Sequence, residues 1–167
     1  GMGSLDGHDV AHLPDAEQSR RFAAEVAGRR VLPAPLEPVL ALAAEHGTPL
    51  EVLRTMVSEL GAVLGWAPTH DLDVDAILDQ TLTLVSVVPT ILAAAHRLGA
   101  GLEPIPPRVD LGHAANYLWM LTGHEPSPEA ARAVEQYLIL TVDHGFNAST
   151  FAARVITSTG ADLAAAI

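Results

Sequence analysis

The sequence contains no cysteine and no lysine, and only 4% of its 167 residues are aromatic. Without cysteine, the chain cannot form disulfide bonds, thiolate nucleophiles or cysteine-bound zinc sites. Its 20 acidic residues against 9 basic ones give a formal net charge of −11. Nucleic acid is therefore disfavoured as a partner, because phosphate binding requires a basic surface. Anionic membrane surfaces are disfavoured for the same reason.

Long apolar runs and targeting signals are also scarce. We expect no apolar run long enough to span a bilayer, and no charged region followed by an apolar stretch opens the sequence. A cytoplasmic protein is the resulting expectation.

The residues that are plentiful favour helices. Hydrophobic residues make up 49% of the chain, and with so few aromatics the core must consist of alanine, leucine and valine. No segment alternates strictly between apolar and polar residues as a half-buried strand would, and no internal repeat is evident. The predicted fold class is all-α, with residues 1–13 as a flexible, tag-proximal segment and residues 14–167 as one helical domain.

Local start and stop signals divide this domain into helices. Thr48, Pro49 and Glu51 have the spacing of a capping box with proline in the first turn. The longest predicted helix contains Pro89, where we expect a kink. The predicted helices cover about residues 15–31, 36–45, 49–64, 73–98, 111–121, 128–142 and, after Asn147, a run with apolar residues at helical spacing as far as Leu163.

The corner at residues 143–150 is the main candidate site. Gly145 can take the left-handed conformation that ends one helix, and Asn147 can cap the next. Because backbone N–H groups at a helix start attract anions, His144 beside them would suit a carboxylate. The alternative is a capped turn in which His144 only hydrogen-bonds a neighbouring carbonyl.

No other arrangement supports a catalytic or metal site. His8 and His12 are four residues apart but have no supporting ligand, and His70 lies among carboxylates typical of a solvated helix start. Asp143 and His144 are adjacent, so they point in different directions on a helix and do not form a dyad. There is no glycine-flanked nucleophile and no phosphate-cradling loop. We predict no metal site and no catalytic residue in this chain, and interpret the remaining helix-end histidines as structural: His46, His96 and His124.

Two longer motifs resemble the citrate synthase family. Residues 106–123 read PPRVDLGHAANYLWMLTG, and residues 138–154 read LILTVDHGFNASTFAAR. Residues 49–55 and 88–91 fit the same pattern, so that the resemblance extends over about residues 30–167. Bacterial citrate and 2-methylcitrate synthases share it.

The resemblance implies an acyltransferase of the tricarboxylic acid cycle type, which condenses acetyl-CoA or propionyl-CoA with oxaloacetate. His144 matches the family histidine that binds the carboxylates of oxaloacetate or citrate. The CoA thioester would be a co-substrate, and no tightly bound cofactor is expected.

Other features of the family have no counterpart in the sequence. The Gly-Pro-Leu-His-Gly-Gly type loop, the catalytic aspartate and the carboxylate-binding arginines of the family belong to later sequence. Thr141 stands where the family commonly has a histidine. We therefore expect this chain alone to lack catalysis.

Two hypotheses follow for partners and function. The resemblance implies that helices near residues 48–64 and 73–98 pack across a two-fold interface, so we expect a homodimer or pairing with a complementary C-terminal citrate synthase chain. In the first hypothesis the chain is the N-terminal part of a citrate synthase-like enzyme. In the second it is a non-catalytic, dimerising helical module that retains the scaffold.

Overall fold

The computed structural model describes residues 14–142 and 145–167. The flexible segment predicted for residues 1–13 lies outside this part of the chain, as do Asp143 and His144. Within the described ranges every regular element is helical and none is a strand, which confirms the all-α prediction. The elements are α1 (Ala16–Gly28), η1 (Ala34–Leu36), α2 (Glu37–His46), α3 (Pro49–Leu64), η2 (Thr69–Asp71), α4 (Val74–Gly99), α5 (His113–Thr122), α6 (Pro128–Thr141), α7 (Ala148–Ser158) and α8 (Leu163–Ala166).

Side-chain caps explain where several helices begin. Asp15 accepts hydrogen bonds from the N–H groups of Glu17 and Gln18, both at 2.8 Å, and thereby starts α1. At the start of α3, the Glu51 carboxylate accepts from the N–H of Thr48 at 2.8 Å and from its hydroxyl at 2.7 Å. These bonds lower the pKa of Glu51, because they favour its charged form. The predicted capping box of α3 is therefore confirmed.

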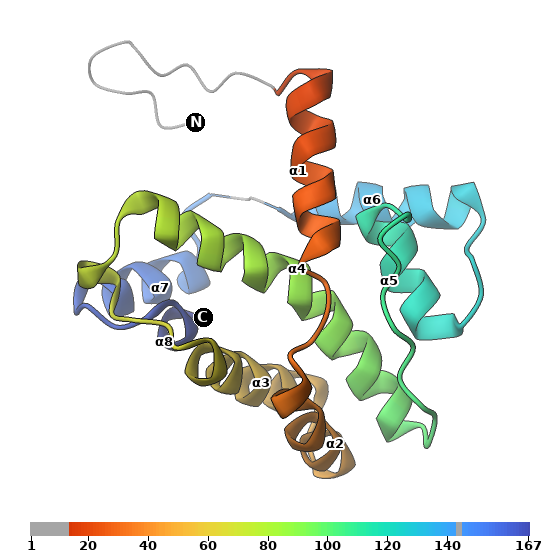
Figure 1. Cartoon of the computed structure of the whole chain (residues 1–167), viewed down its shortest axis with the longest axis horizontal. Coiled ribbons are helices and arrows are strands. Elements are labelled where there is room, and N and C mark those ends of the chain that lie inside the picture. The colour runs from red at the N-terminus through yellow and green to blue at the C-terminus, as the bar shows by residue number, and fades with distance from the viewer. Residues whose placement is uncertain (1–13, 143–144) are drawn as a thin grey trace.

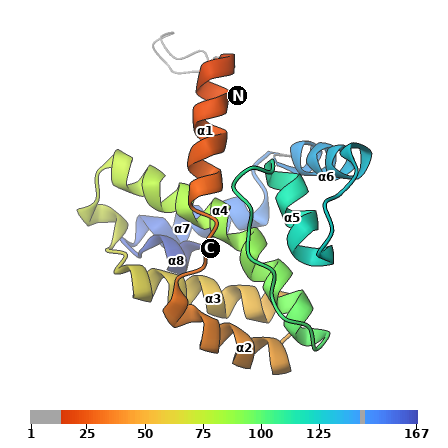
Figure 2. The same ribbon diagram turned by 45° about the vertical axis from the view of Figure 1, so that its right-hand side comes forward.

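The hydrophobic core surrounds α4, which crosses the molecule diagonally, with α2 and α3 on one side and α5 on another (Figure 1). Figure 2 shows α1 standing away from this body and reaching it through its C-terminal end. Alanine, leucine and valine form most of the core, as the composition predicted, and Met56 and Ile91 are added to them: Leu36, Leu40, Val52, Met56, Val57, Leu60, Leu84, Val87, Ile91, Ala94 and Ala95.

One expectation about α4 is wrong. It has 26 residues, and an 18-residue window within it has a mean hydropathy of 1.6, so by length and composition it is long enough to cross a membrane. Its apolar character has another explanation, because Leu84, Val87 and Ile91 are buried in the core among α2 and α3. Pro89 lies inside α4 without ending it.

The end of the chain also differs from the sequence prediction. Helical spacing of apolar residues predicted one helix from Asn147 to Leu163, but α7 ends at Ser158 and a separate α8 follows. Gly160 has a φ of +82°, which lets the chain turn, and Asp162 then caps α8 by accepting from the N–H of Ala165 at 3.0 Å. The turn brings α8 against α3, where a Cβ placed on Gly61 would lie 2.7 Å from the Cβ of Ala164.

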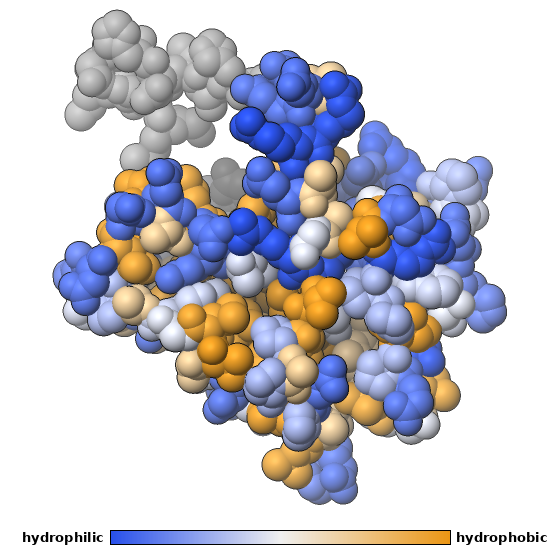
Figure 3. Space-filling view, viewed as in Figure 1, coloured by the Kyte–Doolittle hydropathy of each residue, from blue (hydrophilic) through white to orange (hydrophobic). Residues whose placement is uncertain are grey.

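The described residues do not enclose all of their apolar side chains. Figure 3 shows the hydrophilic α1 at the top and apolar surface exposed over the body beneath it. Among the described helices, α6 and α7 expose several large apolar side chains and have no buried residue.

Candidate functional site

The α6–α7 corner has the local conformation that the sequence predicted. Gly145 has a φ of +97°, in the left-handed region that favours glycine. A Cβ placed there would meet no atom within 4 Å, so the backbone conformation, not crowding, is what favours glycine. Before the corner, the hydroxyl of Thr141 donates to the carbonyl of Tyr137 at 2.9 Å, so its side chain serves the last turn of α6.

Asn147 begins α7 as expected. Its side-chain oxygen accepts from the N–H of Thr150 at 2.8 Å, and its carbonyl accepts from Phe151 at 2.9 Å. The remaining N–H groups in the first turn of a helix have no partner within the helix, and the helix dipole makes this end attractive to anions. The corner therefore presents a helix start that suits a carboxylate.

An aromatic pair and an arginine flank this helix start. The rings of Phe146 and Phe151 meet edge to face, with 6.1 Å between their centroids. The guanidinium carbon of Arg154 lies 5.7 Å from the centroid of Phe146, in the geometry of a cation–π contact. We did not single out Phe146 and Arg154 from the sequence, although Arg154 follows Asn147 by two helical turns and so returns to the same side of α7.

His144, the residue predicted to bind substrate, lies outside the described residues, and its role stays a prediction. The described part of the corner brings together Gly145, Phe146, Asn147 and Arg154. These groups can bind and orient an anion, and none of them is a general acid or base poised near neutral pH.

The nine arginines, all of them in the described part, differ in how they are used. Arg29 forms a 2.6 Å ion pair with Asp79, Arg97 donates to the carbonyls of Glu103 and Leu121, and Arg132 pairs with Glu135. Arg20, Arg21 and Arg54 are exposed on α1 and α3. Arg154 is thus the arginine whose contacts place it at the corner.

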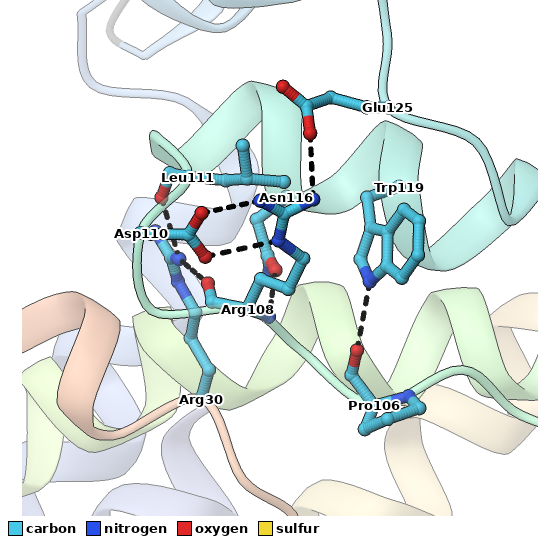
Figure 4. A network of polar contacts seen from close by, with 8 residues as sticks. All are labelled: Arg30, Pro106, Arg108, Asp110, Leu111, Asn116, Trp119 and Glu125. Carbon is cyan, nitrogen blue, oxygen red and sulfur yellow. Dashed lines mark hydrogen bonds and ion pairs between the residues drawn. The ribbon is translucent and has the colours of Figure 1, made fainter.

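Apart from the corner, a cluster of polar contacts holds the segment before α5 in place (Figure 4). Arg30 is 3% exposed, and its guanidinium donates to the carbonyls of Arg108 at 2.6 Å and Leu111 at 2.8 Å. Its own carbonyl accepts from the hydroxyl of Thr90 in α4 at 2.7 Å. Burial lowers the pKa of Arg30 from its ordinary value. Arg30 thus joins the end of α1 to α4 and to the segment before α5, a role that no local sequence pattern indicates.

Arg108 extends this cluster to the surface. It pairs with Asp110 and, at 2.7 Å, with Glu125, and both hydrogen bonds raise its pKa. The same contact lowers the pKa of Asp110. Its guanidinium lies 5.3 Å from the ring centroid of Trp119, whose indole N–H donates to the carbonyl of Pro106 at 3.1 Å (Figure 4). These contacts involve the first family motif, residues 106–123, and stabilise the fold.

A buried amide and a half-buried histidine lie beside this cluster. Asn116 is 1% exposed, and its side-chain oxygen accepts from the N–H of Arg108 at 2.7 Å. His113 begins α5, and burial, followed by the nearby charge of Arg30, lowers its pKa. Both effects favour the uncharged form of the imidazole.

The described residues offer no group of three or more histidine, aspartate or glutamate side chains that could hold a metal ion. His8 and His12 lie outside this part of the chain. His70 packs beside Gly160, where a Cβ would come within 2.8 Å of its Nδ1. One ring nitrogen of His124 lies 3.0 Å from the carbonyl of Thr122. Both contacts agree with structural roles for these histidines.

Comparison with known proteins identifies the family. Residues 10–167 match the family described as "Citrate synthase, C-terminal domain", and the chain belongs to the citrate synthase family. It is 39% identical over 153 residues to a citrate synthase of Deinococcus radiodurans, covering 92% of this chain and 40% of that protein. It is 42% identical to a 2-methylcitrate synthase of Mycobacterium tuberculosis, covering 92% of this chain and 38% of that one.

Solved structures agree with the sequence comparisons. The fold matches the crystal structure of citrate synthase from Pyrobaculum aerophilum with a TM-score of 0.82 and 33% identity, over 93% of this chain and 40% of that one. Citrate synthase from Thermotoga maritima gives a TM-score of 0.78 at 32% identity, over 93% and 39% of the two chains. The chain thus spans about 40% of the length of these relatives.

Proposed function

We propose that this chain forms part of a citrate synthase-type acyltransferase, which condenses acetyl-CoA or propionyl-CoA with oxaloacetate. The similarity to both a citrate synthase and a 2-methylcitrate synthase supports the reaction type and leaves both acyl groups open. In this proposal the CoA thioester is a co-substrate, and the chain binds no cofactor tightly. Turnover requires the part of such an enzyme that the chain does not match.

The observation that carries the proposal is the start of α7. Asn147 caps a helix whose N-terminus attracts anions, and the exposed Arg154 lies two turns further along. His144, directly before Gly145 in the sequence, would donate to one carboxylate of oxaloacetate. Charged donors strengthen hydrogen bonds to a carboxylate, which makes this a binding and orienting role.

Proton removal from the acyl-CoA falls to groups outside this chain. The corner supplies donors and a cation, whereas deprotonating a carbon next to a thioester requires a positioned base. We therefore expect oxaloacetate binding without turnover from the chain alone.

Two measurements test the proposal. Release of CoA should be undetectable from oxaloacetate and either acyl-CoA with the chain alone, and should appear when the missing part of a relative is co-expressed with it. Isothermal titration should show oxaloacetate binding that His144→Ala weakens at least tenfold. His46→Ala, which removes an exposed imidazole at the end of α2, should leave binding unchanged. Absence of both binding and turnover in every combination would refute the proposal.

The use of the arginines favours a second candidate, a dimerising helical module without catalysis. Five of the nine arginines hold the fold together through ion pairs or buried carbonyls, and the net charge of −11 opposes binding of anionic substrates. Under this alternative, light scattering would show a dimer through α3 and α4, and neither oxaloacetate nor an acyl-CoA would bind.

A further inference from the structure

The residue before the cap of α7 packs on the helix that it precedes. Asn147 is the N-cap, so Phe146 holds the position directly before the cap and Phe151 holds the fourth position of the helix. The edge-to-face contact between these two rings has the arrangement of a hydrophobic staple. A staple fixes the angle at which the chain enters a helix. The direction in which the first N–H groups of α7 point therefore depends on the ring of Phe146.

The turn that carries Phe146 is tight. The N–H of Asn147 donates to the carbonyl of Gly145 at 3.0 Å and closes a three-residue turn with Phe146 at its centre. Gly145 has no side chain, and the side chain of Asn147 caps α7. Of the three residues in this turn, Phe146 is thus the one whose side chain can hold the turn against the helix.

The two rings are exposed, and a cation adds to their contact. Phe146 is 65% exposed and Phe151 is 58% exposed, so the hydrophobic core holds neither ring in place. Arg154 lies three residues beyond Phe151 on the same face of α7, and its guanidinium carbon lies 5.7 Å from the centroid of the Phe146 ring. Cation–π attraction and the apolar stem of the arginine both favour this arrangement. We call Phe146, Phe151 and Arg154 the α7 staple.

The far end of α7 is fixed separately. The N–H and the hydroxyl of Thr69 in η2 both donate to the carbonyl of Ala161, at 3.3 and 3.0 Å. His70 packs beside Gly160 in the same turn after α7. A helix that is fixed at its last turn can still change its angle at the first turn unless a second contact holds that end. The α7 staple supplies this second contact.

We propose that Arg154 is a positioning residue for oxaloacetate: acting through Phe146, it fixes the start of α7, where a carboxylate of the substrate would be held. The inference rests on the proposed function and names a residue that positions its site. The guanidinium stays over the ring and does not contact the substrate, so removing either partner should have the same effect on binding. A direct ligand would behave differently, because a carboxylate bound to the guanidinium does not need the ring.

The test is a double-mutant cycle on the full 167-residue chain, measured by isothermal titration with oxaloacetate. Arg154→Met keeps an apolar stem and removes the cation, whereas Phe146→Leu keeps an apolar side chain and removes the aromatic face. Each should weaken binding about two- to fivefold, as loss of an exposed cation–π contact would. The double variant should bind no more weakly than either single variant. Arg154→Lys and Phe146→Trp retain a cation and an aromatic face, so they should restore binding to within about twofold of the unchanged chain.

A matched control separates position from charge. Arg132→Met removes the same charge from an exposed ion pair on α6 and should leave oxaloacetate binding unchanged. Circular dichroism should show equal helix content in all variants, because each altered side chain is exposed.

A second measurement needs no substrate. The N–H groups of Thr150 and Phe151 both donate to Asn147, so their amide exchange reports on the start of α7. Exchange at both should be faster in Arg154→Met and in Phe146→Leu, and no faster in the double variant than in either single one.

Three results would overturn the proposal. Losses of affinity that multiply in the double variant would show that the two side chains act independently. Binding that Arg154→Met weakens and Phe146→Leu leaves unchanged would make the guanidinium itself the ligand. Unchanged amide exchange in both single variants would show that the α7 staple does not fix this end of the helix.

The two measurements separate this inference from the proposed function. If the unchanged chain bound no oxaloacetate, the proposed function and the substrate role of Arg154 would both be refuted, and coupled amide exchange would still show that the staple fixes the start of α7. Binding that depends on His144 but on neither Arg154 nor Phe146 would support the function and refute the positioning role.

Discussion

The helices α3 and α4 differ from α6 and α7 in how deeply their apolar side chains are buried. In α3 and α4, side chains such as Met56, Leu60 and Ile91 are fully buried against one another. In α6 and α7, equally apolar side chains such as Leu140 are exposed to solvent. Amphipathic helices of similar composition therefore make different contributions here. The first pair supplies most of the buried core of this chain, whereas the second contributes no buried residue to it.

The largest expected effect tests how the body is joined to the segment before α5. Arg30→Met removes hydrogen bonds to the carbonyls of Arg108 and Leu111 and leaves both carbonyls without this donor. Because hydrogen bonds from charged groups contribute about 1.5–3 kcal/mol each, loss of the two bonds should lower the free energy of unfolding by about 3–6 kcal/mol. The matched control is Arg132→Met on the surface of α6, whose ion pair is worth less than about 1 kcal/mol. Chemical denaturation of both variants makes the comparison, and a loss no greater than that of the control would show that these hydrogen bonds are dispensable.

A second prediction sets one buried leucine against one exposed leucine. Leu60→Ala removes a fully buried side chain from α3 and should lower the free energy of unfolding by about 2–5 kcal/mol. Leu140→Ala in α6 should change it by less than about 0.5 kcal/mol. Urea unfolding monitored by circular dichroism measures both. If both variants lost the same free energy of unfolding, α6 would be packed as tightly as α3, and the difference between the two pairs of helices would not hold.

A third prediction concerns the start of α7. Asn147→Ala removes the cap and should cost about 1 kcal/mol, mainly as faster amide exchange in the first turn of this helix. Asn147→Asp should restore protection, because a carboxylate also caps a helix and suits the positive end of its dipole. Faster amide exchange in α3 and α4 as well would contradict this prediction, because it would show that the start of α7 is coupled to the core.

The smallest expected effect is a pH dependence at the surface. Because Arg108 lowers the pKa of Asp110 below its unfolded value, their ion pair stabilises the fold above the unfolded pKa of about 3.9. That stabilisation is lost as the pH falls through the lower folded pKa. Asp110→Asn should therefore lower the midpoint of urea unfolding slightly at pH 7, and by less at pH 3. Glu103→Gln, which alters an exposed carboxyl nearby in the sequence, is the control. If the effect of Asp110→Asn on the urea midpoint were larger at pH 3 than at pH 7, the predicted pH dependence would be wrong.

Local signals in the sequence predicted most of the fold. Thr48 with Glu51, and Gly145 with Asn147, fix helix ends through hydrogen bonds between residues two to four apart, so their spacing in the sequence is enough to read them. The family resemblance added the reaction type and His144, whose role the described residues do not test.

The misses arise where distant residues decide the structure. Because apolar residues recur at helical spacing as far as Leu163, the sequence predicted one continuous helix after Asn147. Gly160 and Asp162 are signals for a helix end and a new helix start that this prediction did not use. The separate α8 packs on Gly61 of α3, which lies more than a hundred residues earlier in the sequence than Ala164. The role of Arg30 could not be predicted for the same reason, since its bonding partners are carbonyls at residues 108 and 111.

These long-range bonds also have a consequence for the order of folding. The hydrogen bonds of Arg30 join residues that are 60, 78 and 81 positions apart. Closing chain loops of that length costs entropy that neighbouring helices such as α2 and α3 do not lose when they pair. The junction around Arg30 should therefore form after the helix pairs, so that its loss speeds unfolding while leaving the rate of folding nearly unchanged.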